Sequence, residues 1–366
     1  MATITAPRTT SLTGFRLDLS QLGPNWYAAV MGTAITANGA AALPVQVPGL
    51  LGFAQAVWAL SLGMLAVLVA ARLVHFAKHR EAARAMLLDN PATAVFYGCP
   101  PMAMLAVGYG TLAVGSSVIG TSAAVGIDLA LWSAGTLYGL AVAVGIPYLL
   151  ITRHRVSPLN ANPTWLLPAV APVVAGALGP ALIPHLASDG AQVAMFYGCF
   201  ALLGAGLLGT LLLLPIVLTG LVHSKLPSLI LTPSLFLVLG PLGQSTTAVN
   251  QLADASRVAA PQLATATLDL AELYGIVVMG FALLWLGVAL AANLRALRAE
   301  MPFAMTWWAF TFPVGTMVTG AAGLAKHTGV GAIGGLAVGL WVLLVLAWAV
   351  ASVRTVAAVA GGRLLR

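Results

Sequence analysis

Long apolar stretches alternate with short polar connections along most of the chain. A helix needs about 20 mostly apolar residues to cross the hydrocarbon core of a bilayer. Ten stretches approach or exceed that length, and they span residues 24–43, 50–75, 95–119, 127–151, 164–187, 191–222, 228–252, 264–293, 304–325 and 330–357. Because a segment in lipid must satisfy its own backbone hydrogen bonds, the pattern predicts an all-α integral membrane protein with ten transmembrane helices. We expect this domain over 23–357, between cytoplasmic tails at 1–22 and 358–366.

Proline is unevenly distributed between the odd-numbered and the even-numbered stretches. The even stretches contain Pro147 and Pro215. The odd stretches contain Pro100, Pro101, Pro168, Pro172, Pro180, Pro233, Pro241 and Pro313. Proline kinks a helix, and a membrane helix tolerates the kink beside neighbouring helices or a water-filled cavity. We therefore predict five helical hairpins in two rings, with bent odd helices around a central pore and even helices facing lipid. The alternative is that prolines are frequent in membrane helices generally.

The composition indicates that most of the protein surface faces lipid, and the distribution of charge indicates how the chain is oriented in the membrane. Of the 366 residues 60% are hydrophobic and 7% are charged, whereas about a quarter of a soluble domain is charged. All but two of the 16 lysines and arginines fall on one predicted side of the membrane, and the exceptions are Arg257 and Lys326. The positive-inside rule then places both termini in the cytoplasm. Topology thus explains the net charge of +7 without a nucleic-acid partner.

Polar side chains recur at helical spacing in the odd stretches. Phe312, Thr316 and Thr319 share one face of the ninth stretch, and Gln244 and Thr247 share one face of the seventh. The first stretch adds Thr33, Thr36 and Asn38. The predicted middle of each odd stretch lacks Asp, Glu, Lys, Arg and His, which ion-coupled carriers usually bury there. We predict a neutral pore that favours weakly hydrated ions, and these residues leave the sign of the ion open.

Two pairs of ionisable residues outside the predicted pore lining are further candidates for a functional role. Asp269 and Glu272 begin the eighth stretch on the side away from the basic connections, as candidate charges at the outer mouth. The alternative is that acids favour a helix N-terminus through its dipole. His75 and His79 have the spacing of a zinc pair but no obvious third ligand. We predict no metal and no cofactor.

Three motifs carry a family resemblance. PNWYAAVMGTAI (24–35), PTWLLPAV (163–170) and WWAFTFPV (307–314) resemble the first, fifth and ninth helices of the tellurite-resistance/dicarboxylate transporter family. That family includes bacterial TehA and plant slow anion channels, and the resemblance covers about residues 20–357. The chain departs from it at Gly32-Thr33-Ala34, where a second glycine is common.

The resemblance implies anions as the permeant class, one pore in each protomer and a homotrimer. It also implies that Phe312 plugs the pore where the odd helices bend. We place the pore-lining kinks at Pro101, Pro168, Pro172, Pro241 and Pro313.

The leading interpretation is an anion channel or facilitative anion transporter with no enzymatic activity. We expect it in the plasma membrane, which in a bacterium is the inner membrane. The alternative within transport is a proton-coupled exporter of dicarboxylate, sulfite or tellurite-like oxyanions. A non-transporting scaffold or a membrane enzyme is a third class, and the absence of a buried acid-base or metal cluster in the predicted pore argues against the enzyme.

Overall fold

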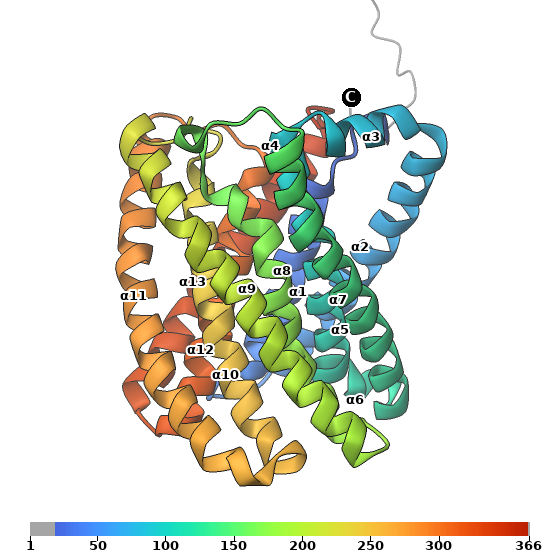
Figure 1. Ribbon diagram of the computed structural model, residues 1–366, viewed down its shortest axis with the longest axis vertical. Coiled ribbons are helices and arrows are strands. Elements are labelled where there is room, and N and C mark those ends of the chain that lie inside the picture. Colours follow the sequence, from blue (N-terminus) through green and yellow to red (C-terminus); the bar gives the residue numbers. More distant parts are fainter. Residues whose placement is uncertain (1–18, 365–366) are drawn as a thin grey trace, which may run out of the picture.

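The computed structural model describes residues 19–364, and the secondary structure in this range is helical (Figure 1). The α-helices are α1 Tyr27–Ala42, α2 Leu50–Lys78, α3 Arg80–Leu88, α4 Pro91–Ala94, α5 Cys99–Gly110, α6 Ser116–Ile119, α7 Thr121–Thr152, α8 Leu167–Leu178, α9 Asp189–Ser224, α10 Leu239–Ala259, α11 Ala264–Arg298, α12 Phe312–Thr328 and α13 Gly331–Ala360. A π-helical turn, η4, covers Thr111–Gly115. Short 3₁₀ segments are η1 Leu19–Gln21, η2 Pro24–Trp26, η3 Val95–Gly98, η5 Pro158–Asn160, η6 Pro163–Leu166, η7 Gly179–His185, η8 Thr232–Val238, η9 Pro261–Leu263 and η10 Met305–Phe310.

Seven helical segments in the described range are long and apolar enough to cross a membrane, which makes this a multi-pass membrane protein. They cover Leu50–Lys78, Pro91–Ile119, Thr121–Thr152, Pro163–His185, Asp189–Ser224, Pro261–Arg298 and Gly331–Ala360. Each overlaps one of the predicted apolar stretches. The three other predicted stretches are also helical, as α1, α10 and α12, but α1 and α12 are shorter, with 16 and 17 residues, and α10 carries more polar side chains.

The predicted tails lie at the two ends of the described range. Residues 1–18, which make up most of the predicted N-terminal tail, and residues 365–366 lie outside it. At the other end α13 continues to Ala360, past the predicted boundary at residue 357.

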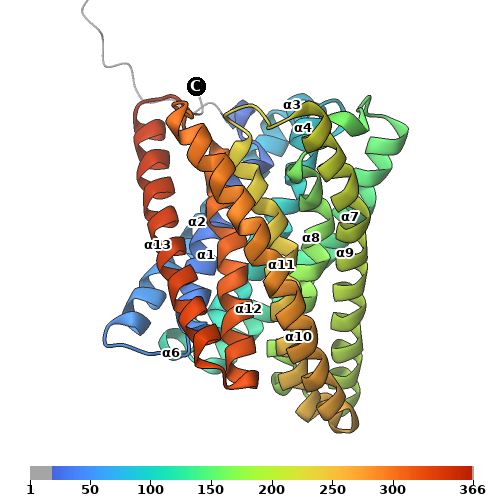
Figure 2. The same ribbon diagram turned by 90° about the vertical axis from the view of Figure 1, so that its left-hand side faces the viewer.

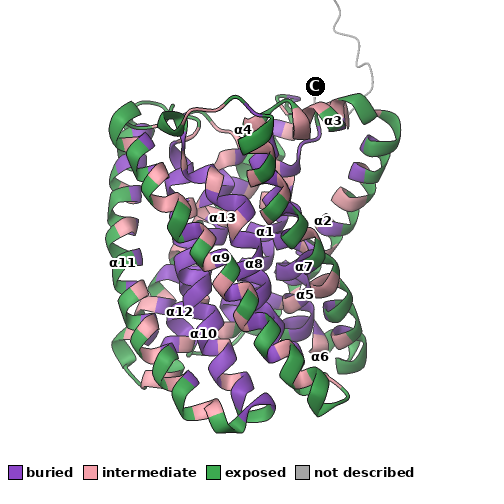
Figure 3. Cartoon of the chain, viewed as in Figure 1, coloured by how far each residue is buried: buried purple, intermediate pink, exposed green. Residues whose placement is uncertain are grey.

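Burial divides the helical segments into two groups (Figure 3). In the most apolar part of Pro163–His185, 89% of the residues are buried, against 22% in Asp189–Ser224. Most positions of α1, α5, α10 and α12 are buried as well. By contrast, α2, α7, α9, α11 and α13 expose large apolar side chains, such as Leu212 at 73%. The five segments built on α1, α5, α8, α10 and α12 are called the buried segments below. The exposed apolar faces are those expected against lipid.

Contacts between helices follow the chain order. Each buried segment contacts the exposed helix that comes after it, in the pairs α1 with α2, α5 with α7, α8 with α9, α10 with α11, and α12 with α13. The buried segments also contact one another in a closed series, α1 to α5, α5 to α8, α8 to α10, α10 to α12, and α12 back to α1. Figure 2 shows α12 between α11 and α13, both of which it contacts.

The prolines of the buried segments mark changes of helix type. Pro101, Pro168 and Pro313 lie in the first turn of α5, α8 and α12; α5 and α8 directly follow a 3₁₀ segment, and α12 follows η10 after one residue. Pro241 is the third residue of α10, which follows η8, whereas Pro172 lies inside α8. Proline suits the first turn of a helix because the N–H that it lacks has no partner within the helix there. Most of these prolines therefore begin a new helix after a 3₁₀ turn.

Two glycines allow the buried helices to approach closely. A Cβ atom on Gly32 of α1 would overlap the Thr311 hydroxyl and would lie 2.7 Å from the Trp308 ring. A Cβ atom on Gly243 of α10 would lie 2.5 Å from the backbone nitrogen of Met317 on α12. The absence of a side chain at these two positions therefore lets α12 lie close to its neighbours at the level of Phe312 and Thr316.

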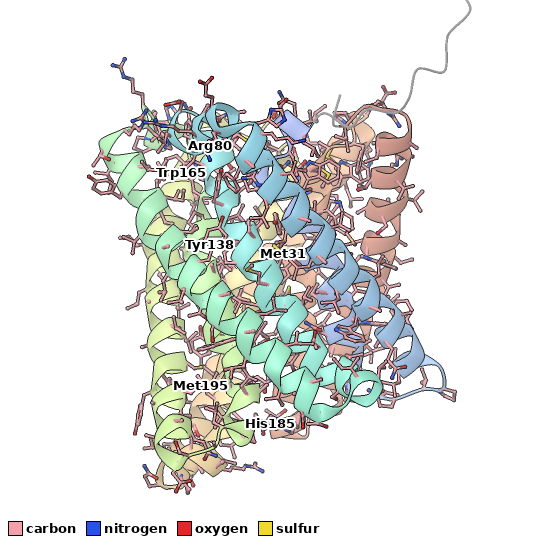
Figure 4. All side chains as sticks on the ribbon, turned by 90° about the vertical axis from the view of Figure 1, so that its right-hand side faces the viewer. Met31, Arg80, Tyr138, Trp165, His185 and Met195 are labelled. Carbon is pink, nitrogen blue, oxygen red and sulfur yellow. The ribbon has the colours of Figure 1, made fainter. Side chains whose placement is uncertain are left out.

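The lysine- and arginine-rich connections gather at one end of the molecule, called here the basic end, which includes α3 and the C-terminus (Figure 1). Figure 4 shows Arg80 at this end, His185 at the opposite end and Met31 between them.

Candidate functional site

A narrow cavity of ≈ 40 Å³ lies toward the basic end, and all five buried segments contribute to its wall. Its lining includes Met31 from α1, Met102 from α5, Val170 from α8, Ser234 from η8 and Phe312 from α12. Most of the lining is apolar, with a few hydroxyl groups. This basic-end cavity therefore offers few groups that could replace the hydration shell of an ion.

A second cavity, of ≈ 500 Å³, lies toward the opposite end and has the same five segments in its wall. Asn38 comes from α1, Tyr109 from α5, Leu178 from α8, Gln251 from α10 and Lys326 from α12. This opposite-end cavity is wider and carries amide, hydroxyl and charged groups.

A short packed region separates the two cavities. On α12, Pro313 lines the basic-end cavity and Thr319 lines the opposite-end cavity; on α10, the corresponding residues are Gly240 and Thr247. At the rise of an α-helix these spacings amount to about 9–11 Å. Phe312 lines the basic-end cavity with 5% of its surface exposed. It lies at the border of the packed region.

The α-helices of four buried segments begin beside the basic-end cavity, after preceding 3₁₀ turns. Cys99, Leu167 and Phe312, the first residues of α5, α8 and α12, line it, and Gly240 is the second residue of α10. A helix macrodipole places about half a positive elementary charge at its N-terminus. The potential of the backbone around this cavity therefore favours anions, even though its lining carries no charged side chain.

The predicted pore-lining polar residues fall in different places. Asn38, Thr247 and Thr319 line the opposite-end cavity. Gln244 and Thr316 are buried at the level between the cavities, on helix faces shared with residues that line them.

The two threonines predicted from α1 have other surroundings. Thr33 lines a separate cavity between α1, α2 and α13, where its hydroxyl accepts a hydrogen bond from the Trp348 indole at 3.1 Å. The Thr36 hydroxyl donates to the Gly32 carbonyl at 2.8 Å.

Of the five predicted pore-lining prolines, one lines the basic-end cavity and four lie outside its described lining. Pro313 lines the basic-end cavity. Pro101, Pro168, Pro172 and Pro241 are buried nearby, outside its described lining. The Pro101 side chain, for example, lies beside Gly139 of α7.

A charged cluster at the opposite-end cavity was missed by the sequence analysis. Asp254 on α10 accepts hydrogen bonds from Lys326 at 2.7 Å and from His327 at 3.1 Å. The second ring nitrogen of His327 lies 2.6 Å from the Asn250 side-chain oxygen. Asp254 follows Gln251 by three residues, so extending the polar face of α10 by one turn would have found it.

The predicted outer-mouth charges lie elsewhere. Asp269 is exposed and Glu272 is half-buried, both on α11, and neither is among the described lining of the opposite-end cavity. The candidate zinc pair is also separate from the cavities. His75 is fully buried, with one ring nitrogen 3.0 Å from the Leu22 carbonyl and 3.0 Å from the Arg72 guanidinium.

The helices and the paired cavities define a multi-pass membrane protein of the transport class. The chain belongs to the SLAC1 family, described as voltage-dependent anion channels, whose profile matches residues 21–356. This finding confirms the predicted resemblance, because the matched range covers most of the chain.

Curated relatives share most of their length with this chain. It is 29% identical over 318 residues to the sulfite efflux pump SSU1 of Arthroderma otae, covering 85% of this chain and 84% of the relative. The same figures hold for the sulfite efflux pump SSU1 of Trichophyton rubrum. It is also 24% identical over 334 residues to an uncharacterized transporter of Methanocaldococcus jannaschii, covering 91% and 92%.

Proposed function

We propose that this protein carries small anions along the axis enclosed by the five buried segments, and that Phe312 closes the path at rest. One observation carries the proposal. The same five segments line a cavity toward each end, and only a packed region about two helical turns long separates the cavities. Opening that region would join them.

The electrostatic environment supports anions over cations. The first turns of α5, α8, α10 and α12 surround the basic-end cavity, where helix dipoles stabilise negative charge. The lysines and arginines at the same end raise the local concentration of anions. Together these features support an anion as the transported ion, whereas the amino-acid pattern alone left the sign of the ion open.

The finer architecture belongs to the same proposal. Ten helices cross the membrane as five hairpins in two rings, with α1, α10 and α12 crossing inside the apolar helices. The closed series of contacts among the buried segments supports this arrangement. The basic end is cytoplasmic, with both termini there, and the membrane is the plasma membrane. Cysteine substitutions at Val47, which is 55% exposed, and at Ser157, labelled from one side at a time with an impermeant reagent, test this orientation.

A homotrimer, with one path in each protomer, remains a prediction from the family resemblance. Light scattering of the purified protein in detergent, corrected for bound detergent, tests it. A monomer mass would contradict it.

Proton-coupled export of sulfite is the second candidate. It is favoured by the relatives named sulfite efflux pumps, which this chain matches over most of their length. Export differs from conduction in its driving force, so the same reconstituted protein separates the two.

The test uses protein in voltage-clamped liposomes or planar bilayers with chloride, nitrate and sulfite gradients. A channel gives a current that reverses at the equilibrium potential of the anion, whereas coupled transport shifts when a pH gradient is imposed. If wild-type protein and its Phe312→Ala variant both carry none of these anions in either assay, the proposed function is wrong.

A further inference from the structure

Most hydroxyl groups along the axis already donate a hydrogen bond to another group of the protein. The Thr316 hydroxyl donates to the Pro313 carbonyl at 2.7 Å. The Thr247 hydroxyl lies 3.0 Å from the Gly243 carbonyl and 2.7 Å from the Thr319 hydroxyl, which in turn lies 3.1 Å from the Thr316 carbonyl. These groups present oxygen lone pairs to the axis. They cannot serve as donors to an anion without breaking a bond within the protein.

Three side chains of the buried segments have a fully shielded oxygen without a partner, and one of them, Asn38, donates through its amide to the Ala106 carbonyl at 3.0 Å. Ser234 and Gln244 each have a fully shielded oxygen without a hydrogen-bond partner, and neither side chain makes another hydrogen bond. Each is 1% exposed. Buried polar groups in folded proteins are almost always paired, so these two unpaired groups, in η8 and α10 of one buried segment, point to a partner from outside the chain.

Both residues face the axis. Ser234 in η8 lines the basic-end cavity. Gln244 in α10 lies between Gly240, which lines the basic-end cavity, and Thr247 and Gln251, which line the opposite-end cavity. The spacings of four, three and four residues keep these side chains on one face of α10. Gln244 therefore lies in the packed region that an anion would cross.

The chemistry of the Gln244 amide narrows the class of anion. Its NH₂ group donates two hydrogen bonds, and its oxygen accepts. A halide accepts hydrogen bonds but cannot donate one to that oxygen. A singly protonated oxyanion such as hydrogen sulfite has oxygen acceptors and one O–H donor, so it satisfies both ends of the amide.

We infer that Ser234 and Gln244 form two successive binding positions for a partly dehydrated oxyanion, and that Gln244 selects a singly protonated oxyanion over a halide. This inference rests on the proposed function and specifies its substrate class. Ser234 supplies a hydroxyl that donates to either kind of anion, so it contributes to the rate of transport. Gln244 contributes to the choice between anions.

The test measures hydrogen sulfite and chloride flux into liposomes at slightly acidic pH, with the Phe312→Ala variant as the background so that the path is open. In that background, Gln244→Leu keeps the side-chain volume and removes both hydrogen-bonding ends. We expect the sulfite-to-chloride flux ratio to fall about tenfold or more, the effect of losing a hydrogen bond to a charged group. Ser234→Ala should lower both fluxes and leave the ratio near its starting value.

Thr246→Val is the matched control. Thr246 is fully buried on α10, its hydroxyl donates to the Leu242 carbonyl at 3.0 Å, and its methyl group faces Gly275 of α11. Its flux ratio should stay unchanged. If Gln244→Leu does not purify as folded protein, Gln244→Met replaces it.

An unchanged ratio in the folded Gln244 variant would overturn the inference while leaving anion transport intact, and would mean that the amide holds a structural water. An absence of both fluxes in the Phe312→Ala background would instead remove the proposed function, and this inference with it.

Discussion

The hydroxyl groups of Thr247 and Thr319 lie 2.7 Å apart in the wall of the opposite-end cavity. They join α10 to α12, which belong to different helical hairpins. Thr247 also lies 3.4 Å from the Thr316 carbonyl, so the pair fixes the two helices beside the packed region. The position of α12, which carries Phe312, depends on this contact.

A double-mutant cycle measures that dependence. Each of Thr247→Val and Thr319→Val keeps the side-chain shape and should reduce stability by about 0.5–1.5 kcal/mol, the net value of a typical hydrogen bond. The double variant should cost less than the sum of the single variants, because both remove the same bond. Unfolding by denaturant in a mild detergent gives the three free energies. Additive losses would show that the hydroxyl groups are independent.

Replacement of Phe312 by alanine should raise anion flux. The ring forms the border between the basic-end cavity and the packed region, so its removal opens space on the axis. We expect an increase of about tenfold or more, because a barrier lowered by 1.4 kcal/mol gives a factor of ten. Single-channel recording or liposome efflux measures it. Folded Phe312→Ala protein with wild-type flux would contradict the gate assignment.

Phe196→Ala is the control for this experiment. Phe196 on α9 is fully buried and contacts Phe200 with ring centroids 5.1 Å apart, outside the described lining of both cavities. Removal of either ring should destabilise the protein by about 3–5 kcal/mol as a core aromatic does. An increase in flux is expected from Phe312→Ala alone.

Gly32→Ala should destabilise the protein and alter the gate region. Its methyl group would overlap the Thr311 hydroxyl, directly before Phe312, so α1 and α12 must move apart. Overpacking of this kind costs about 1–3 kcal/mol. Thermal unfolding and basal flux report the two effects.

Gly52→Ala on α2 is the control, since a Cβ atom there meets nothing within 4 Å, and stability should rise by about 0.5–1 kcal/mol. If the Gly32→Ala variant is as stable as the wild-type protein, the approach between Gly32 and Thr311 is not tight.

Asp254→Asn should raise anion flux at low ionic strength. The substitution removes the partner charge of Lys326 and leaves an uncompensated cation in the wall of the opposite-end cavity. Anions should then concentrate there, and the gain should shrink at about 1 M salt, where the Debye length is about 3 Å. Stability should change by about 1 kcal/mol or less, because both side chains are partly exposed.

Asp189→Asn controls for the loss of a negative charge at the same end. Asp189 is exposed in the first turn of α9, outside the described lining of the opposite-end cavity. Its variant should show wild-type flux at every salt concentration. Equal gains in both variants would mean that net charge, and not Lys326, attracts the anion.

Much of the fold could be predicted because hydropathy and proline act locally. Each long apolar stretch in the sequence is helical, since lipid leaves no other partner for its backbone. The stretches rich in proline are buried, because the interior can satisfy the backbone groups that a proline frees, whereas the exposed helices α7 and α9 each contain one proline, Pro147 and Pro215. Pro313 and its neighbour Phe312 were located from one short motif, and both line the basic-end cavity.

The rest depended on contacts between distant segments. Thr33 was predicted to line the pore, but its hydroxyl accepts from Trp348, more than 300 positions away, in a cavity on the other side of α1. Thr33, Thr36 and Asn38 do not fall on one face of a helix, so their spacing alone could not decide which of them reaches the axis. His327 stood alone in the sequence, whereas its ring contacts Asn250 and Asp254 on α10.

The parallel direction of the buried segments makes the two mouths of this molecule unlike each other. One vestibule is tight and electropositive through its backbone, whereas the other is broad, with its one lysine neutralised by an adjacent carboxylate. An anion entering from the tight side meets its strongest attraction before the barrier, and one entering from the broad side meets it afterwards. The proposed conduit should therefore rectify, and its current–voltage curve should bend even in symmetrical solutions.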